Sequence, residues 1–182
     1  SIDGIVPTHP QPPFDFSLAR FAVDGTDQDA TLNGGTNNED FRGFAGNDLI
    51  LAGGGNDKVF GGEGDDRIDA GGDNDTINGG AGADEMFGGL GADVFEYFDH
   101  TDSTGTATDV IVDFQAGVDK IDLSQVFGFT PAMTGNFIGN VASHSVFGNE
   151  VIYYHQDNKT VVGAQVDDGS GTPKQMIIEI DD

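Results

Sequence analysis

Six aspartates recur every nine residues in the first half of the chain: Asp48, Asp57, Asp66, Asp75, Asp84 and Asp93. Each follows a glycine-rich run and lies two residues before a large apolar residue. A single aspartate in such a turn usually serves only its own backbone. Six at one phase, beside turns that direct several carbonyl oxygens to one point, supply the carboxylate and carbonyl ligands that Ca²⁺ prefers. The pattern therefore predicts a series of calcium sites.

These aspartates belong to nine-residue repeats that extend from residue 25 to residue 96. Divided at that period, the sequence reads GTDQDATLN, GGTNNEDFR, GFAGNDLIL, AGGGNDKVF, GGEGDDRID, AGGDNDTIN, GGAGADEMF, GGLGADVFE. The template is G-G-x-G-x-D-x-U-x, in which U is a large apolar residue. Position eight is apolar in every repeat: Leu32, Phe41, Ile50, Val59, Ile68, Ile77, Met86 and Phe95. Position six departs from aspartate only in the first two repeats, which have Ala30 and Glu39.

The period predicts an all-β fold, a parallel β-roll. Glycine-rich positions form a tight turn that needs positive φ, and the last three residues of each repeat form a minimal strand. Alternation along this strand places position eight on the inner face. Two repeats complete one coil, so repeats n and n+2 stack about 4.8 Å apart, the spacing of neighbouring strands.

Stacking arranges the aspartates in two columns, one along each edge of the roll. One column holds Asp48, Asp66 and Asp84, and the other holds Asp57, Asp75 and Asp93. Without a cation these carboxylates would repel one another strongly. We expect about four good sites, with about four to six calcium ions in all. A weaker site lies between Glu39 and Asp57. The column of Asp48, Asp66 and Asp84 should end at Ala30, which has no side-chain oxygen.

The two flanking regions have different compositions. Residues 1–24 contain Pro7, Pro10, Pro12 and Pro13, which predict an extended linker followed by a short lead-in to the repeats. Residues 97–182 read as ordinary β sequence, with strands expected at 109–114, 119–123, 150–155, 160–166 and 175–180. These strands should cap the open end of the roll.

Composition excludes several function classes. Seven Lys and Arg face 32 Asp and Glu, and a formal net charge of -25 opposes binding to nucleic acids or anionic membranes. There is no cysteine, and no apolar stretch is long enough to span a membrane. No signal peptide is visible. The four histidines, His9, His100, His144 and His155, do not have metal-binding or catalytic spacing. We therefore expect no enzyme activity in this chain.

At the repeats the sequence resembles the RTX proteins, which Gram-negative bacteria export by type I secretion. Downstream, residues 109–114 (DVIVDF) and 117–124 (GVDKIDLS) resemble the C-terminal domain of the serralysin metalloproteases. The same segment occurs in R-modules of alginate epimerases. The resemblance implies a right-handed roll followed by a C-terminal β cap. The serralysin zinc signature H-E-x-x-H-x-x-G-x-x-H is missing from the chain, so no protease is expected here.

The resemblance also implies which carbonyl groups ligate calcium. In the family, positions two and four of one turn join positions one and three of the turn stacked on it. Carried over, the carbonyl ligands are Phe44, Gly46, Gly53, Gly55, Gly61, Gly62, Glu63, Gly64, Ala70, Gly71, Gly72, Asp73, Gly79, Ala81, Gly88 and Leu90. Weaker candidates, including two carboxylates just past the repeats, are Gly35, Asn37, Glu39, Ala52, Gly54, Gly80, Gly82, Asp102 and Asp109. Asp73 occupies a position where glycine is usual.

These features predict a module that stays unfolded at low cytosolic calcium and folds when it binds calcium outside the cell. It would support type I secretion and the stability of an upstream passenger in the same polypeptide. The alternative is a calcium-dependent module that attaches a secreted enzyme or adhesin to polysaccharide or a cell surface.

Overall fold

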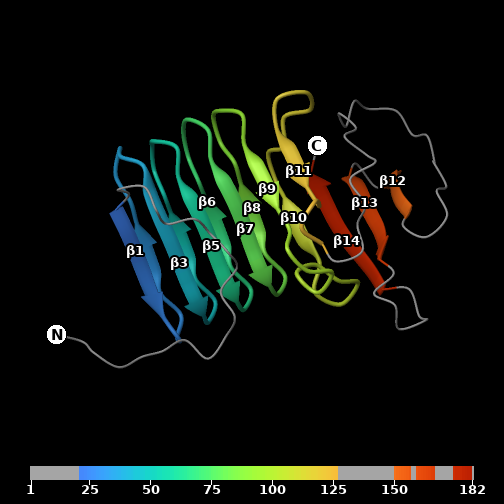
Figure 1. Cartoon of the computed structure of the whole chain (residues 1–182), viewed down its shortest axis with the longest axis horizontal. Coiled ribbons are helices and arrows are strands. Elements are labelled where there is room, and N and C mark those ends of the chain that lie inside the picture. The colour runs from blue at the N-terminus through green and yellow to red at the C-terminus, as the bar shows by residue number, and fades with distance from the viewer. Residues whose placement is uncertain (1–20, 127–149, 157–158, 167–173, 182) are drawn as a thin grey trace.

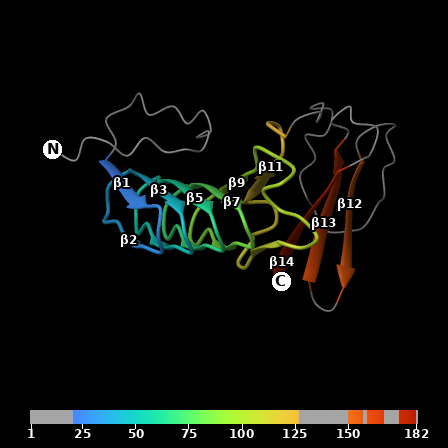
Figure 2. The ribbon, with the colours of Figure 1, turned by 90° about the horizontal axis from the view of Figure 1, so that it is seen from below.

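A computed structural model describes residues 21–126, 150–156, 159–166 and 174–181, and all of its regular elements are β-strands. They form two sheets that lie one above the other in the roll (Figure 1, Figure 2). Sheet A contains, in spatial order, β1 (Phe21–Thr26), β3 (Glu39–Ala45), β5 (Lys58–Glu63), β7 (Thr76–Ala81), β9 (Val94–Glu96) and β11 (Lys120–Asp122). Sheet B contains β2 (Thr31–Asn33), β4 (Leu49–Leu51), β6 (Arg67–Asp69), β8 (Glu85–Phe87), β10 (Asp109–Ile111), β14 (Lys174–Asp181), β13 (Lys159–Val166) and β12 (Glu150–Gln156).

The chain alternates between the sheets, and each strand pairs in parallel with the strand one coil away. In sheet B, for example, Ile50 pairs with Ile68 and Ile68 with Met86. The register is therefore two repeats, eighteen residues, which confirms the predicted parallel β-roll. No cysteine or helix is needed to hold the layers, since each coil satisfies its strand backbone through the next.

The core is the line of position-eight side chains between the sheets. All eight are buried, from Leu32 to Phe95. Ile111 and Ile121, from the strands that follow the repeats, continue the same core. Burial of one apolar residue per repeat gives a thin core, so the turns at both edges must contribute much of the stability.

The C-terminal strands extend both sheets beyond the last repeat. β11 pairs in parallel with β9, and β10 pairs in parallel with β8. β14 then joins β10 in parallel, and β12, β13 and β14 form an antiparallel meander that continues sheet B (Figure 2). The predicted C-terminal β cap is confirmed, with all five strands near their expected positions.

Two regional predictions are not settled by these strands. β1 begins at Phe21, ahead of the first repeat, and pairs with β3 as the first strand of sheet A. The proline-rich linker lies in residues 1–20, outside the described residues. The boundaries at residues 24 and 96 stay a prediction. No helix in the described part of the chain has the length and apolar character to cross a bilayer.

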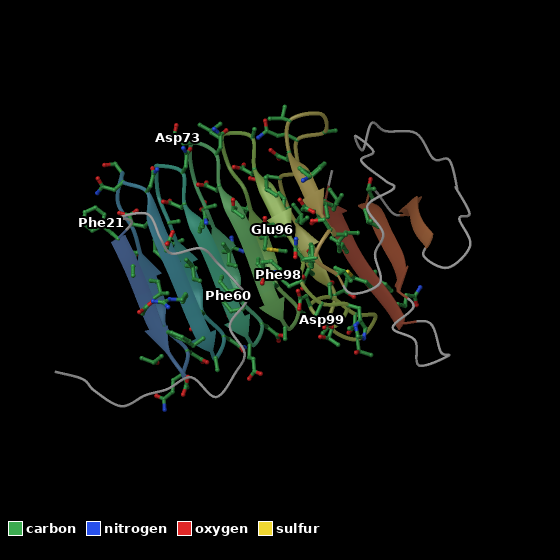
Figure 3. The ribbon with its side chains drawn as sticks, viewed as in Figure 1. Phe21, Phe60, Asp73, Glu96, Phe98 and Asp99 are labelled. Atoms are coloured by element: carbon green, nitrogen blue, oxygen red, sulfur yellow. The ribbon has the colours of Figure 1, made fainter. Side chains whose placement is uncertain are left out.

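The turns run in two rows, one along each edge of the roll. We call edge A the row formed by residues 25–30, 43–48, 61–66 and 79–84, which lead into sheet B. We call edge B the row formed by residues 34–39, 52–57, 70–75 and 88–93, which lead into sheet A. Asp73, labelled in Figure 3, marks edge B, along the top of that view.

Positive φ recurs at positions two and four of the turns. Two of these positions carry side chains: Phe44 (φ 80°) at position two and Asp73 (φ 75°) at position four. The left-handed region favours glycine because it has no Cβ. The neighbours Gly71 and Gly72 show the contrast. Gly71 has a φ of 103°, and a Cβ there would lie 2.0 Å from the carbonyl oxygen of Gly53, whereas the nearest atom to a Cβ on Gly72 is 4.0 Å away.

Substitution of these two glycines tests the turn geometry. We expect Gly71→Ala to lower the free energy of unfolding in saturating calcium by at least about 1–2 kcal/mol, the cost of a left-handed alanine. Gly72→Ala should be neutral or slightly stabilising, since it only restricts the unfolded chain. Denaturant titration followed by circular dichroism measures both. Equal losses in the two variants would contradict this geometry.

Candidate metal centre

One oxygen of each position-six aspartate bonds to the coil before it. Oδ1 of Asp66 accepts the N–H of Asp48 at 2.8 Å, and Oδ1 of Asp84 accepts the N–H of Asp66 at 2.9 Å. On edge B, Oδ1 of Asp75 accepts from Asp57 at 2.7 Å, and Oδ1 of Asp93 accepts from Asp75 at 2.9 Å. The structure thus brings the six aspartates together as the two predicted columns.

The second oxygen has no such partner. In Asp48, Asp66, Asp75, Asp84 and Asp93, Oδ2 is buried and no hydrogen-bond donor reaches it among the described residues. A buried carboxylate oxygen without a partner costs far more than a solvated one. The same buried Oδ2 atom recurs in this state along both edges, and a bound cation would satisfy it at each position.

On edge A these oxygens lie against the first glycine of their own turn. A Cβ on Gly61 would lie 2.3 Å from Oδ2 of Asp66 and 2.4 Å from the carbonyl oxygen of Gly79 in the next coil. Gly43 has the same surroundings, with Asp48 Oδ2 at 2.3 Å and the Gly61 carbonyl at 2.2 Å. Position one therefore joins a carboxylate oxygen and a carbonyl oxygen from two stacked coils at one point.

Main-chain carbonyls must supply the remaining ligands. Within the part of the chain that the structure describes, no three carboxylate or imidazole side chains gather as a metal site. The turns predicted to share an ion do stack: Phe44 pairs with Gly62, Gly62 with Gly80 and Glu63 with Ala81. On edge B, Gly54 bridges to Gly72 and Gly72 to Leu90. The remaining predicted carbonyl residues occupy these same turns: Gly46, Gly53, Gly55, Gly61, Gly64, Ala70, Gly71, Asp73, Gly79 and Gly88.

Ligation by these carbonyls stays a prediction. Some of the turn carbonyls and amides already form hydrogen bonds within the roll. On edge A the position-three carbonyls are engaged, because Glu63 O accepts the N–H of Gly46 and Ala81 O that of Gly64, both at position four. On edge B, Gly55 N–H instead donates to the Asp73 carboxylate at 3.2 Å. The position-three carbonyls therefore differ in their bonding between the two edges.

The weaker candidates divide into two groups at the ends of the columns. At the start, the Glu39 carboxylate accepts the N–H of Gly35 within its own turn, while Glu39 N–H donates to Asp57. Asn37, Ala52 and Gly54 lie in the turns around it, and Gly80 and Gly82 lie in the last edge A turn. Ala30 N–H still donates to Asp48 Oδ1 at 2.7 Å, so the hydrogen-bond ladder on edge A reaches one coil beyond the last carboxylate.

At the far end, the columns continue past the repeats. Asp109 Oδ1 accepts the N–H of Asp84, as the next member of edge A. Asp102 is buried and instead accepts the N–H groups of Phe98 and Asp99 in its own loop. The buried Tyr97 hydroxyl has a raised pKa, first because of burial and then because of the Asp109 carboxylate.

The sequence prediction missed Asp119, which extends edge B. Its Oδ1 accepts the N–H of Asp93 at 3.0 Å, as position six of a further coil would. The spacing is 26 residues here, and 25 between Asp84 and Asp109, so a nine-residue search does not find either. The local signal is present nonetheless: Asp109 and Asp119 each precede a buried isoleucine by two residues, as position six precedes position eight.

A second ladder of side chains at position five was also missed. On edge A, Asp29 Oδ1 accepts the N–H of Asn47, Asn47 Oδ1 that of Asp65, and Asp65 Oδ1 that of Ala83. Edge B repeats the arrangement with Asn38, Asn56, Asn74 and Ala92. These bonds are 2.7–3.0 Å long and run in the opposite direction to the position-six ladder. The backbone amides at positions five and six of one turn therefore donate to side chains of different neighbouring coils. The signal in sequence was the Asn or Asp at position five of the first six repeats.

Burial shifts the titration of the columns. It is the largest cause of the raised pKa of Asp66 and Asp75, to about 8 in each, and the neighbouring aspartates of the same column raise them further. Burial likewise raises the pKa of Asp84 to about 7 and of Asp109 to about 9. Without a cation, the folded roll therefore favours neutral carboxyl groups at neutral pH.

These shifts predict an inverted pH dependence in the absence of calcium. A carboxyl whose pKa is raised in the folded state stabilises that state below its unfolded pKa, about 4, and this stability is lost as pH rises through about 7–9. In calcium-free buffer, the folded fraction of the chain should therefore decrease as pH rises from 5 to 9. In saturating calcium, protons compete with the ion and the trend should reverse.

The β signal in circular dichroism measures the calcium-free trend, and urea titration at each pH measures the trend in saturating calcium. Asp66→Asn should flatten the calcium-free trend. Calcium-free stability that rises with pH would show that the columns are not buried as described.

The sequence model of the family described as "Peptidase M10 serralysin C terminal" matches residues 13–181. No curated protein is similar enough to match the sequence. Two solution structures of subunits of an Azotobacter vinelandii mannuronan C5-epimerase are similar, AlgE6R3 and AlgE6R2. AlgE6R3 is 24% identical, with 92% of this chain and 78% of that chain covered and a TM-score of 0.43. AlgE6R2 is 19% identical, with coverages of 88% and 83% and a TM-score of 0.47.

Proposed function

Because the chain belongs to the serralysin C-terminal family of the M10 peptidases, we propose that it is a calcium-binding β-roll module of a secreted protein. The family is the non-catalytic C-terminal part of those peptidases, in agreement with the expectation that this chain is not an enzyme.

The observation that carries the proposal is the pair of carboxylate columns. Five buried Oδ2 atoms, spaced one coil apart within each column, have no hydrogen-bond donor among the described residues, and a cation would satisfy all of them in the same way. Oxygen-only ligands, carboxylate and carbonyl, favour Ca²⁺ over softer metals, and the number of oxygens in each pair of stacked turns suits its six to eight ligands. The six repeat aspartates are the carboxylate ligands, with Asp109 and Asp119 at the far ends of the two columns.

Calcium would also decide whether the chain folds. With a formal charge of -25 and one apolar residue per repeat in the core, the calcium-free roll must bury repelling carboxylates for little apolar gain. Each bound ion removes that repulsion and adds its binding free energy to folding. Extracellular calcium modules bind at about 10⁻⁴–10⁻³ M. Such a module stays unfolded in a cell and folds outside it.

This switch suits type I secretion from a Gram-negative bacterium. A chain that crosses the exporter unfolded and folds on arrival in calcium would draw an upstream passenger with it and stabilise that passenger afterwards. The repeat sequence and the serralysin-type cap support this role. Binding to polysaccharide stays a prediction, because no feature of the described residues favours it, and the acidic surface would repel anionic polymers.

Chelation with a matched pair of variants tests the proposal. The β signal in circular dichroism should disappear in excess EDTA at pH 8 and return on calcium addition. Asp66→Asn removes a charge shared by two stacked sites and should raise the calcium concentration at half-folding by at least about tenfold. Asp69→Asn, at an exposed position on the same coil, should leave that concentration unchanged. A chain that stays fully folded in EDTA, or equal effects of the two variants, would contradict the proposal.

A further inference from the structure

The two edges differ in the residues that surround their aspartates. Position one on edge A is glycine in every repeat, whereas edge B has the buried alanines Ala52 and Ala70. At position five, edge A alternates the carboxylates Asp29 and Asp65 with the uncharged Asn47 and Ala83, whereas edge B has only the uncharged Asn38, Asn56, Asn74 and Ala92. The same hydrogen bond is made in each case, so the difference between Asp and Asn there is one of charge.

Edge A is also the more acidic row as a whole. Outside position six, its repeat turns carry Asp27, Asp29, Glu63 and Asp65. Edge B carries Asp73 and, at position six of its first turn, Glu39 in place of aspartate. Each edge has one side chain in the left-handed region, Phe44 (φ 80°) on edge A and Asp73 (φ 75°) on edge B, so backbone strain does not distinguish the edges.

The charge at position five reaches the column beside it. Asp65 is exposed, and its Oδ1 holds the N–H of Ala83 at 2.9 Å, which fixes the carboxylate beside the turn of Asp84. Asp65 also directly precedes Asp66, so its charge lies beside two successive members of the edge A column. A fixed negative charge beside two carboxylates attracts a cation that binds between them.

We propose that the two columns are not equivalent, and that the position-five carboxylates, Asp65 foremost, make edge A fill at lower calcium concentrations than edge B. This inference rests on the proposed calcium function and adds an order to it. Asp65 acts on affinity through the field at the Asp66 and Asp84 sites while it keeps the coil-to-coil hydrogen bond. The edge A sites would then be occupied by calcium before calcium binds to the turns of edge B.

Position-specific NMR during a calcium titration of the whole chain separates the columns. The amide groups of Asp48 and Asp66 donate to edge A carboxylates, and those of Asp57 and Asp75 donate to edge B carboxylates, so each amide reports its own column. In the parent chain, the edge A signals of the folded state should reach half-intensity at lower calcium than the edge B signals.

Two isosteric variants then exchange the charges. Asp65→Asn keeps an Oδ1 acceptor and should raise the edge A midpoint by about twofold to fivefold, with edge B unchanged. Asn74→Asp, its counterpart on edge B, should lower the edge B midpoint by a similar factor. Both shifts should shrink as NaCl is raised, because position five is exposed and screened, whereas a purely structural effect would not depend on salt.

The outcomes are distinguishable. Coincident midpoints in the parent chain, equal shifts of both columns in either variant, or shifts that do not respond to salt would overturn the inference while leaving calcium binding intact. Absence of any calcium-dependent signal would instead overturn the proposed function. Unchanged circular dichroism of both variants in saturating calcium is the check that the exchanges have not altered the fold.

Discussion

The structure depends on one constraint: carboxylates on successive coils must be buried within a strand spacing of each other. The eighteen-residue register places every position-six aspartate over its counterpart, and one oxygen of each is held by a backbone amide. The other oxygen is buried, close to the carboxylates of the neighbouring coils. Without compensation, neither the thin apolar core nor the backbone ladder could easily offset this cost. Under the proposed function, a bound calcium ion would replace this repulsion with attraction and would stabilise the stacked coils.

Much of the fold could be predicted from the period alone. An apolar residue every nine positions, in phase with glycines and an aspartate, can be buried on one line only if two repeats make a coil. The C-terminal strands were predictable because their alternation of apolar and polar residues is ordinary. Their manner of attachment was not. The sequence between Glu96 and Asp109 has no nine-residue period, so only tertiary structure shows that β10 and β11 continue the two sheets of the roll.

The candidate site was predictable where chemistry and period coincide, as in Asp48 to Asp93. The site was less predictable where only the residue type or only the nine-residue spacing remains. Asp119 keeps the local pattern but not the spacing, and its place in the column depends on a longer connection. The position-five side chains keep the spacing, but Asn and Asp are common in turns for many reasons. Their role emerges only from the direction of their hydrogen bonds, each reaching the coil opposite to the one that the adjacent aspartate serves.

The most direct test of the central claim is anomalous diffraction from crystals of the whole chain grown in calcium. The account predicts a peak between each stacked pair of aspartates on both edges, with carboxylate and carbonyl oxygens at about 2.3–2.6 Å. Peaks should be absent beside Ala30, where the edge A column has lost its carboxylate. A well-ordered roll whose Asp66 and Asp75 carboxylates face water or protonated neighbours, with no anomalous signal along either edge, would contradict it.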